Sequence, residues 1–193
     1  MRRLTKLALA ASVPLLAWYV LVVRARAHFP EDTIPEGAYA RIVLAINGGR
    51  PRDAFAYLET QAQWACFTIG DYRSKAAARI AQTYPEPQKS AALAEYRGEI
   101  ALDGAEVWAA LAEQRGFLAL LHKDLSGASK VEIEGERATI ETAHGTRYAF
   151  RRRENGIWGL TTFTGELLAE ADKAARDLQM VARAAGDYER AAR

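Results

Sequence analysis

Hydrophobic residues in the first two thirds of the chain recur at steps of three and four, which is the period of amphipathic helices. This period predicts a helix over 36–47 and a second helix that starts at Pro51 and carries an apolar stripe through Ile69. The stripe continues past Gly70 to Ile80. One long helix with a kink and two shorter helices that meet at the glycine are both compatible with this pattern.

Two local signals divide the helical region further. The prolines of residues 84–87 end the long stripe, because proline lacks a backbone donor and biases its predecessor away from helix. A short helix is expected next. Asp103 and Glu106 then have the spacing of a capping box, and the helix that they open carries its stripe through Leu121. We therefore expect helices over residues 36–125.

Between residues 129 and 163 the hydrophobic period changes from 3.6 to 2, as in β-strands. A two-residue loop at 135–136 and three-residue loops at 143–145 and 154–156, each of the latter ending in glycine, fix one register. This register places the large apolar residues on a single face. They are Val131, Ile133, Ala138, Ile140, Tyr148, Phe150, Trp158 and Leu160.

The other face of the sheet provides an independent test of this register. It places Glu134 opposite Arg137 and Glu141 opposite Arg147, so that unlike charges face each other across neighbouring strands. A two-residue loop at either glycine would mix apolar and charged residues on one face. The pattern therefore predicts a four-stranded antiparallel meander over 129–163.

The last stretch, residues 165–193, is again helical and rich in alanine. Its apolar residues repeat at alternating steps of four and three, which is a heptad seam. The seam consists of Leu167, Ala171, Ala174, Leu178, Val181, Ala185 and Tyr188. Because alanine buries little area, we expect this helix to pack on the body of the protein itself. A partner helix, including that of a second copy, is the alternative.

The strongest single signal is the stretch 7–23, which contains 17 residues and no charge. A helix of this length spans about 25 Å, and the arginines on both sides can extend to the interfaces of a hydrocarbon core of about 30 Å. We interpret it as an uncleaved single-pass anchor, and a secretory signal cleaved near Ala27 is the alternative. The basic residues are slightly more numerous before the span, which favours a cytoplasmic N-terminus and an extracytoplasmic C-terminal domain, periplasmic if the source is bacterial.

Taken together, these patterns predict an α+β protein. An N-terminal transmembrane helix precedes a helical layer that packs on a four-stranded antiparallel meander, and a long C-terminal helix follows. The predicted segments are an anchor or signal over 1–27, a tether over 28–35, an α+β domain over 36–163 and an amphipathic helix over 165–193.

The basic residues at the N-terminus account for the positive net charge of the chain. The formal net charge is +2, but residues 1–27 hold five basic side chains and no acidic one, so the remainder has a net charge of −3. The basic run Arg151-Arg152-Arg153 lies in a predicted strand, where successive side chains alternate between faces and form no single patch. These observations argue against a nucleic-acid surface.

The residues that could carry chemistry are few. The single cysteine, Cys66, cannot close an intramolecular disulfide, and its place on an apolar stripe predicts a small buried hydrophobe. A nucleophilic cysteine would need a base, for which His122 is the candidate. Three scattered histidines and no phosphate-loop, dinucleotide or zinc motif leave no predicted cofactor or metal site.

Helices followed by a meander that ends in Glu154-Asn155-Gly156-Ile157-Trp158-Gly159-Leu160 resemble the nuclear-transport-factor-two-like (SnoaL-like) superfamily over residues 36–163. The resemblance implies a cone, in which helices pack into the concave face of a bent sheet. It also implies either small-molecule isomerase, cyclase or dehydratase chemistry or no chemistry at all. Enzymes of this type use an Asp–His or Tyr–Asp pair, for which Asp71, Tyr72 and His122 are the candidates here.

The hypothesis that we carry forward is a membrane-anchored, extracytoplasmic and non-enzymatic domain that binds a protein partner or a small apolar ligand. The alternative is a cone-pocket enzyme that uses Asp71 as the base, assisted by Tyr72 or His122. That alternative requires the three side chains to converge in one pocket.

Overall fold

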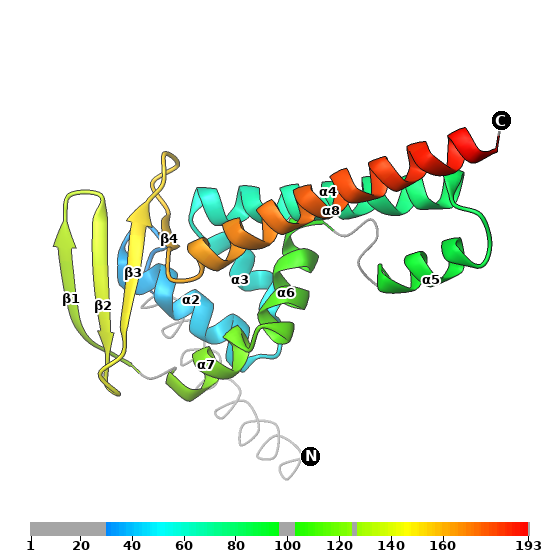
Figure 1. Ribbon diagram of the computed structural model, residues 1–193. Coiled ribbons are helices and arrows are strands. Elements are labelled where there is room, and N and C mark those ends of the chain that lie inside the picture. Colours follow the sequence, from blue (N-terminus) through cyan, green and yellow to red (C-terminus); the bar gives the residue numbers. More distant parts are fainter. Residues whose placement is uncertain (1–29, 97–102, 125–126, 193) are drawn as a thin grey trace, which may run out of the picture. The chain divides into compact units, whose positions relative to one another are not determined.

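The computed structural model describes residues 30–96, 103–124 and 127–192, and it divides the chain into two compact units, residues 1–31 and 32–193. The second unit is an α+β domain, as predicted (Figure 1). Its helices are α2 (Pro35–Asn47), α3 (Pro51–Ala54), the 3₁₀ helix η1 (Phe55–Tyr57), α4 (Thr60–Thr83), α5 (Gln88–Glu95), α6 (Gly104–Gln114), α7 (Phe117–Asp124) and α8 (Thr164–Ala191).

The sheet is a four-stranded antiparallel meander in the order β1-β2-β3-β4, and its register is the predicted one. Val131 faces Ile140, which in turn faces Tyr148, and the predicted charge pairs also lie opposite each other. Both three-residue loops close as expected. The strands are β1 (Ala128–Glu134), β2 (Arg137–Thr142), β3 (Arg147–Arg152) and β4 (Trp158–Leu160).

One face of the sheet is buried under helices, and α2 packs across it. The rings of Tyr39 on α2 and Tyr148 on β3 lie 6.0 Å apart. The predicted apolar residues of β2, β3 and β4 are buried, whereas Val131 is half-buried and Ile133 is exposed on the outer strand β1. The apolar face therefore forms the sheet's share of the core, except at the far end of β1.

The chain between η1 and α4 differs from the prediction, which placed one continuous helix from Pro51 through Ile69. Leu58 leaves the helix and forms a parallel bridge with Leu160 of β4. The backbone N–H of Glu59 donates to the carbonyl of Leu160 at 3.1 Å. Sequence periodicity missed this break because Leu58 is buried in the core whether it lies on a helix or beside a strand.

Beyond this link, α4 is one helix that passes through Gly70, so the alternative of two helices that meet at the glycine is wrong. Helix α8 runs beside it (Figure 1), and both helices start near β4 and end close together, where the rings of Tyr84 and Tyr188 lie 4.9 Å apart. Small residues on both helices allow close packing. We call this parallel pair the arm. Its buried alanines are Ala62, Ala65, Ala76 and Ala77 on α4 and Ala171, Ala174 and Ala185 on α8.

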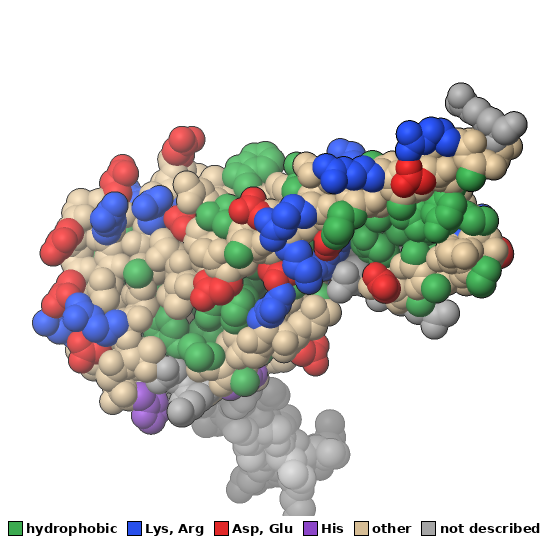
Figure 2. All heavy atoms as spheres, in the orientation of Figure 1, with side chains coloured by type: hydrophobic (Ala, Val, Ile, Leu, Met, Phe, Trp, Pro, Cys, Tyr) green, Lys and Arg blue, Asp and Glu red, His purple; other side chains and the backbone are tan. Residues whose placement is uncertain are grey.

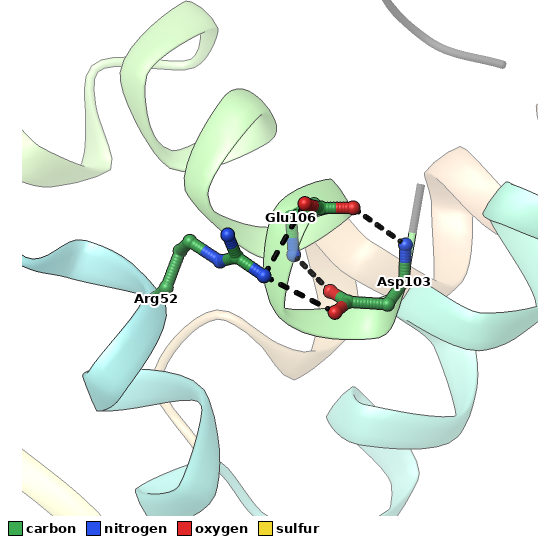
Figure 3. Close-up of polar contacts among 3 residues, drawn as sticks. All are labelled: Arg52, Asp103 and Glu106. Carbon is green, nitrogen blue, oxygen red and sulfur yellow. Dashed lines mark hydrogen bonds and ion pairs between the residues drawn. The ribbon is translucent and has the colours of Figure 1, made fainter. Parts of the chain in front are cut away.

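The predicted capping box at the start of α6 is present (Figure 3). The backbone N–H of Glu106 donates to Asp103 Oδ1 at 2.7 Å, and the backbone N–H of Asp103 donates to Glu106 Oε2 at 3.0 Å. Arg52 lies against both carboxylates, with Nη2 at 3.2 Å from each. The helix that this box opens is shorter than predicted. It ends at Gln114, and Gly116, with φ of 74°, separates it from α7.

The predicted anchor over 7–23 lies outside the described residues. Within the described ranges, no helix is both long and apolar enough to cross a membrane. The final residues of the predicted tether belong to the folded unit. The carbonyls of Asp32 and Thr33 accept hydrogen bonds from the backbone N–H and the indole Nε1 of Trp158, at 3.2 and 3.0 Å.

Candidate functional site

A groove of about 690 Å³ lies between the arm, the end of α5 and the end of α6. In Figure 2, hydrophobic side chains gather along the side of the arm that faces α5, and charged side chains lie next to them. Four helices and the residues that follow three of them line the groove. The α4, α5 and α6 sides contribute Arg73, Tyr84, Glu95, Tyr96, Gln114 and Arg115. The α8 side contributes Glu170, Lys173, Asp177, Met180, Val181 and Ala184.

An arginine–glutamate–arginine cluster forms one end of this groove. Glu170 on α8 is only 13% exposed and accepts ion pairs from Arg73 Nη2 at 3.7 Å and from Arg115 Nη2. A buried carboxylate would be costly without such partners. The cluster therefore joins α4, α6 and α8 and fixes the relative position of three walls of the groove.

Two tyrosines contribute rings to the apolar part of the groove. Tyr84 packs edge-to-face on Tyr188, and its hydroxyl lies 3.5 Å from the carbonyl of Val181. Burial raises the pKa of Tyr84, and negative charge on Tyr188 would raise it further. Burial also raises the pKa of Tyr96, with smaller contributions from Asp177 and Glu95. Both side chains are therefore neutral near pH 7 and can offer a ring face together with a hydroxyl.

Three charged side chains of the groove are unpaired within the described part of the chain, where Lys173, Asp177 and Glu95 form no ion pair. Met180 beside them is 59% exposed. The groove thus combines tyrosine rings and an exposed methionine, residue types that are enriched in protein interfaces, with available charges of both signs beside them.

The structure does not bring together the catalytic candidates of the sequence. Asp71 lies on the exposed side of α4, where its Oδ2 accepts from Lys75 Nζ at 2.7 Å. Tyr72 is half-buried on the same helix, and His122 is exposed near the end of α7. No hydrogen bond or ion pair of the described residues joins any two of the three.

Cys66 is completely buried in the core, in agreement with the sequence-based prediction. Burial raises the pKa of its thiol to about 12, which keeps the thiol protonated and unreactive near neutral pH. Iodoacetamide should therefore leave Cys66 unmodified in the folded protein and modify it fully in denaturant, as measured by intact mass. Equal labelling rates in the two states would contradict this prediction.

Sequence reasoning missed the groove residues because they come from four helices and from the residues that follow three of them. The periodic pattern marks which residue of a helix is buried, whereas Lys173, Asp177 and Met180 lie outside the heptad seam. One available signal was the presence of tyrosines at both ends of the short α5 region, Tyr84 and Tyr96.

Across the residues that the structure describes, no group of three or more His, Cys, Asp or Glu side chains could hold a metal ion. The resemblance to the nuclear-transport-factor-two-like superfamily stays a prediction. Comparisons with family models, with curated proteins and with solved structures find no match for this chain.

Proposed function

We propose that the chain is a membrane-anchored, extracytoplasmic binding domain whose groove takes a segment of a protein partner, without a chemical step. The observation that carries this proposal is the groove lining, in which tyrosine rings and Met180 lie beside Lys173, Asp177 and Glu95. A small apolar ligand would remove these charges from water without compensation. A peptide segment can pair with both signs of charge while its apolar side chains cover Met180.

Attachment to the membrane rests on the sequence of residues 7–23. This stretch has no charged residue, and basic side chains precede and follow it. Insertion of an arginine at the centre of such a span costs about 2.5–3.5 kcal/mol. The proposal places the groove outside the cytoplasm, either on a tethered domain or, if the chain is cleaved near Ala27, on a secreted one.

Membrane attachment is tested with the full chain expressed in membranes. The native chain should stay in the membrane pellet during alkaline carbonate extraction, and Leu15→Arg should move a large fraction into the supernatant. Intact mass of the pelleted protein separates an uncleaved anchor from a cleaved signal. A native chain that extracts completely at its full mass would contradict the anchor.

The groove is tested by placing a photoreactive amino acid at Met180 and, as a control, at the equally exposed Ile133 on β1. Illumination in native membranes should yield a discrete adduct only from position 180. Lys173→Glu combined with Asp177→Lys should reduce that adduct severalfold, because two of the three available charges are reversed. Equal adducts from both positions, or an adduct that is insensitive to charge reversal, would reject the groove as the binding site.

Self-association through residues 165–193 is a different form of the same proposal. The buried seam positions of α8 pack against α4 within the chain, which leaves the exposed side of α8 for such contacts. An adduct from position 180 with twice the mass of the chain would assign the partner segment to a second copy.

A further inference from the structure

A second cavity, of about 600 Å³, lies between the first turns of α4 and the loop that joins β3 to β4. None of its lining residues belongs to the groove of the proposed function. Its α4 side consists of Glu59, Thr60, Gln61, Gln63 and Trp64, and its sheet side consists of Arg151, Arg152, Arg153, Glu154 and Asn155.

The base of this cavity is held rigidly by backbone contacts. Leu58 and Glu59 are tied to β4 by the parallel bridge and by the hydrogen bond to Leu160. A Cβ at Gly159 would lie only 2.6 Å from the Cα of Glu59, so the two segments touch directly. These contacts fix the distance between the start of α4 and β4 at the base of the cavity.

Side chains of a strand would alternate between faces, but β3 ends at Arg152, and Arg151, Arg152 and Arg153 all line this cavity, which corrects the expectation that they form no single patch. Positive charge therefore exceeds negative charge here, because three arginines face the two carboxylates of Glu59 and Glu154. Glu59 is 5% exposed and pairs with Arg151 at 3.5 Å.

Arg153 is partly used by the fold, because its Nη1 donates to the carbonyl of Leu58 at 3.2 Å, its Nε is buried and its guanidinium lies within electrostatic range of Asp32 and Tyr57. Arg152 forms no ion pair in the described part of the chain. Guanidinium groups with unused donors are suited to carboxylate and phosphate oxygens.

An exposed indole lies at the same cavity. Trp64 is 65% exposed, and it contacts Phe67 edge-to-face with ring centroids 6.0 Å apart. Tryptophan normally removes much of its surface from water, and in the described residues both Trp108 and Trp158 are buried. A flat apolar group that enters the cavity can stack on the indole of Trp64.

We propose that this cavity binds an organic anion, in which a carboxylate or phosphate contacts Arg152 and Arg153 and a flat ring lies against Trp64. The charge excess selects against cations, and the indole selects for aromatic over aliphatic anions. The site goes beyond the proposed function, because it lies elsewhere on the domain and takes a different class of ligand.

Ligand binding can be followed by the fluorescence of Trp64, since the other two tryptophans of the described residues are buried. The full chain in a non-ionic detergent is titrated with benzoate and with phenyl phosphate, which separate carboxylate from phosphate recognition. Benzamide, acetate and inorganic phosphate serve as controls without a charge or without a ring. Saturable quenching is expected from one or both aromatic anions, with a Kd at least about tenfold lower than that of the ring-free anion, equivalent to about 1.4 kcal/mol. Benzamide should give no saturable quenching.

Substitutions locate the site. Arg152→Gln and Arg153→Gln should each raise the Kd about tenfold, measured by calorimetry as well as fluorescence, whereas Arg147→Gln on the same strand should leave it unchanged. Arg152 is exposed, so its variant tests the site even if Arg153→Gln disturbs the fold. Trp64→Phe should abolish the fluorescence response. Equal responses to benzoate and benzamide, or a Kd unaffected by Arg152→Gln, would overturn the proposal.

Discussion

Replacing Trp108 by alanine is expected to lower the free energy of unfolding by about 3–5 kcal/mol. Trp108 has no exposed surface, and its ring packs against those of Phe117 and Phe163, with centroid separations of 6.2 and 5.8 Å. Its indole Nε1 also donates to the carbonyl of Pro51 at 3.0 Å. The substitution therefore leaves a large cavity and removes a hydrogen bond at once. Urea denaturation followed by circular dichroism measures the loss.

Trp64→Ala is the matched control, because it removes the same side chain from an exposed position. We expect it to cost at most about 1 kcal/mol, most of it from the lost contact with Phe67. Trp108→Phe separates the two contributions at the buried site, since it keeps a ring but leaves the carbonyl of Pro51 without its donor. Similar losses for Trp108→Ala and Trp64→Ala would contradict the assignment of Trp108 to the core.

The second large effect is expected at Gly159 in β4. A Cβ there would lie 2.6 Å from the Cα and 2.7 Å from the N of Glu59, and 2.8 Å from the carbonyl oxygen of Leu58. All three are backbone atoms of a segment that is hydrogen-bonded to the sheet, so they cannot rotate away. Gly159→Ala should therefore destabilise the domain by about 3 kcal/mol, the upper part of the range for overpacking.

Gly165→Ala provides the control for this substitution. Apart from its own chain neighbours and the backbone of α8, no heavy atom lies within 4 Å of a Cβ at Gly165, which sits in the first turn of that helix. Alanine there should leave stability unchanged or raise it by up to about 1 kcal/mol, because glycine loses more backbone entropy on folding. If Gly159→Ala were as harmless as Gly165→Ala, the contact between β4 and the Leu58–Glu59 link would be wrong.

The sheet was predictable from the sequence in detail because two independent constraints agree there. Loop lengths at residues 135–136, 143–145 and 154–156 fix the pairing, and a shift of one residue would exchange apolar and charged side chains between faces. The capping box of α6 was predictable for a similar reason, since Asp103 and Glu106 satisfy each other's backbone donors within four residues.

Features that depend on long-range contacts were not predictable in the same way. Leu58 keeps helical spacing in the sequence, yet it pairs with Leu160, about a hundred positions later. The groove is formed by side chains that meet only after α8 has packed on α4. The chemical candidates of the sequence, Asp71, Tyr72 and His122, were chosen by residue type, which carries no information on whether side chains converge.

The parallel pairing of α4 and α8 has a consequence for the order of folding. All of α5 through β4 lies between these helices in the chain, and one side of α4 packs against α8, which is synthesised about a hundred residues later. Until α8 emerges from the ribosome, this side of α4 is open to water and to other chains. Ribosome-bound intermediates that end before residue 164 should therefore associate with chaperones, and release should follow completion of α8.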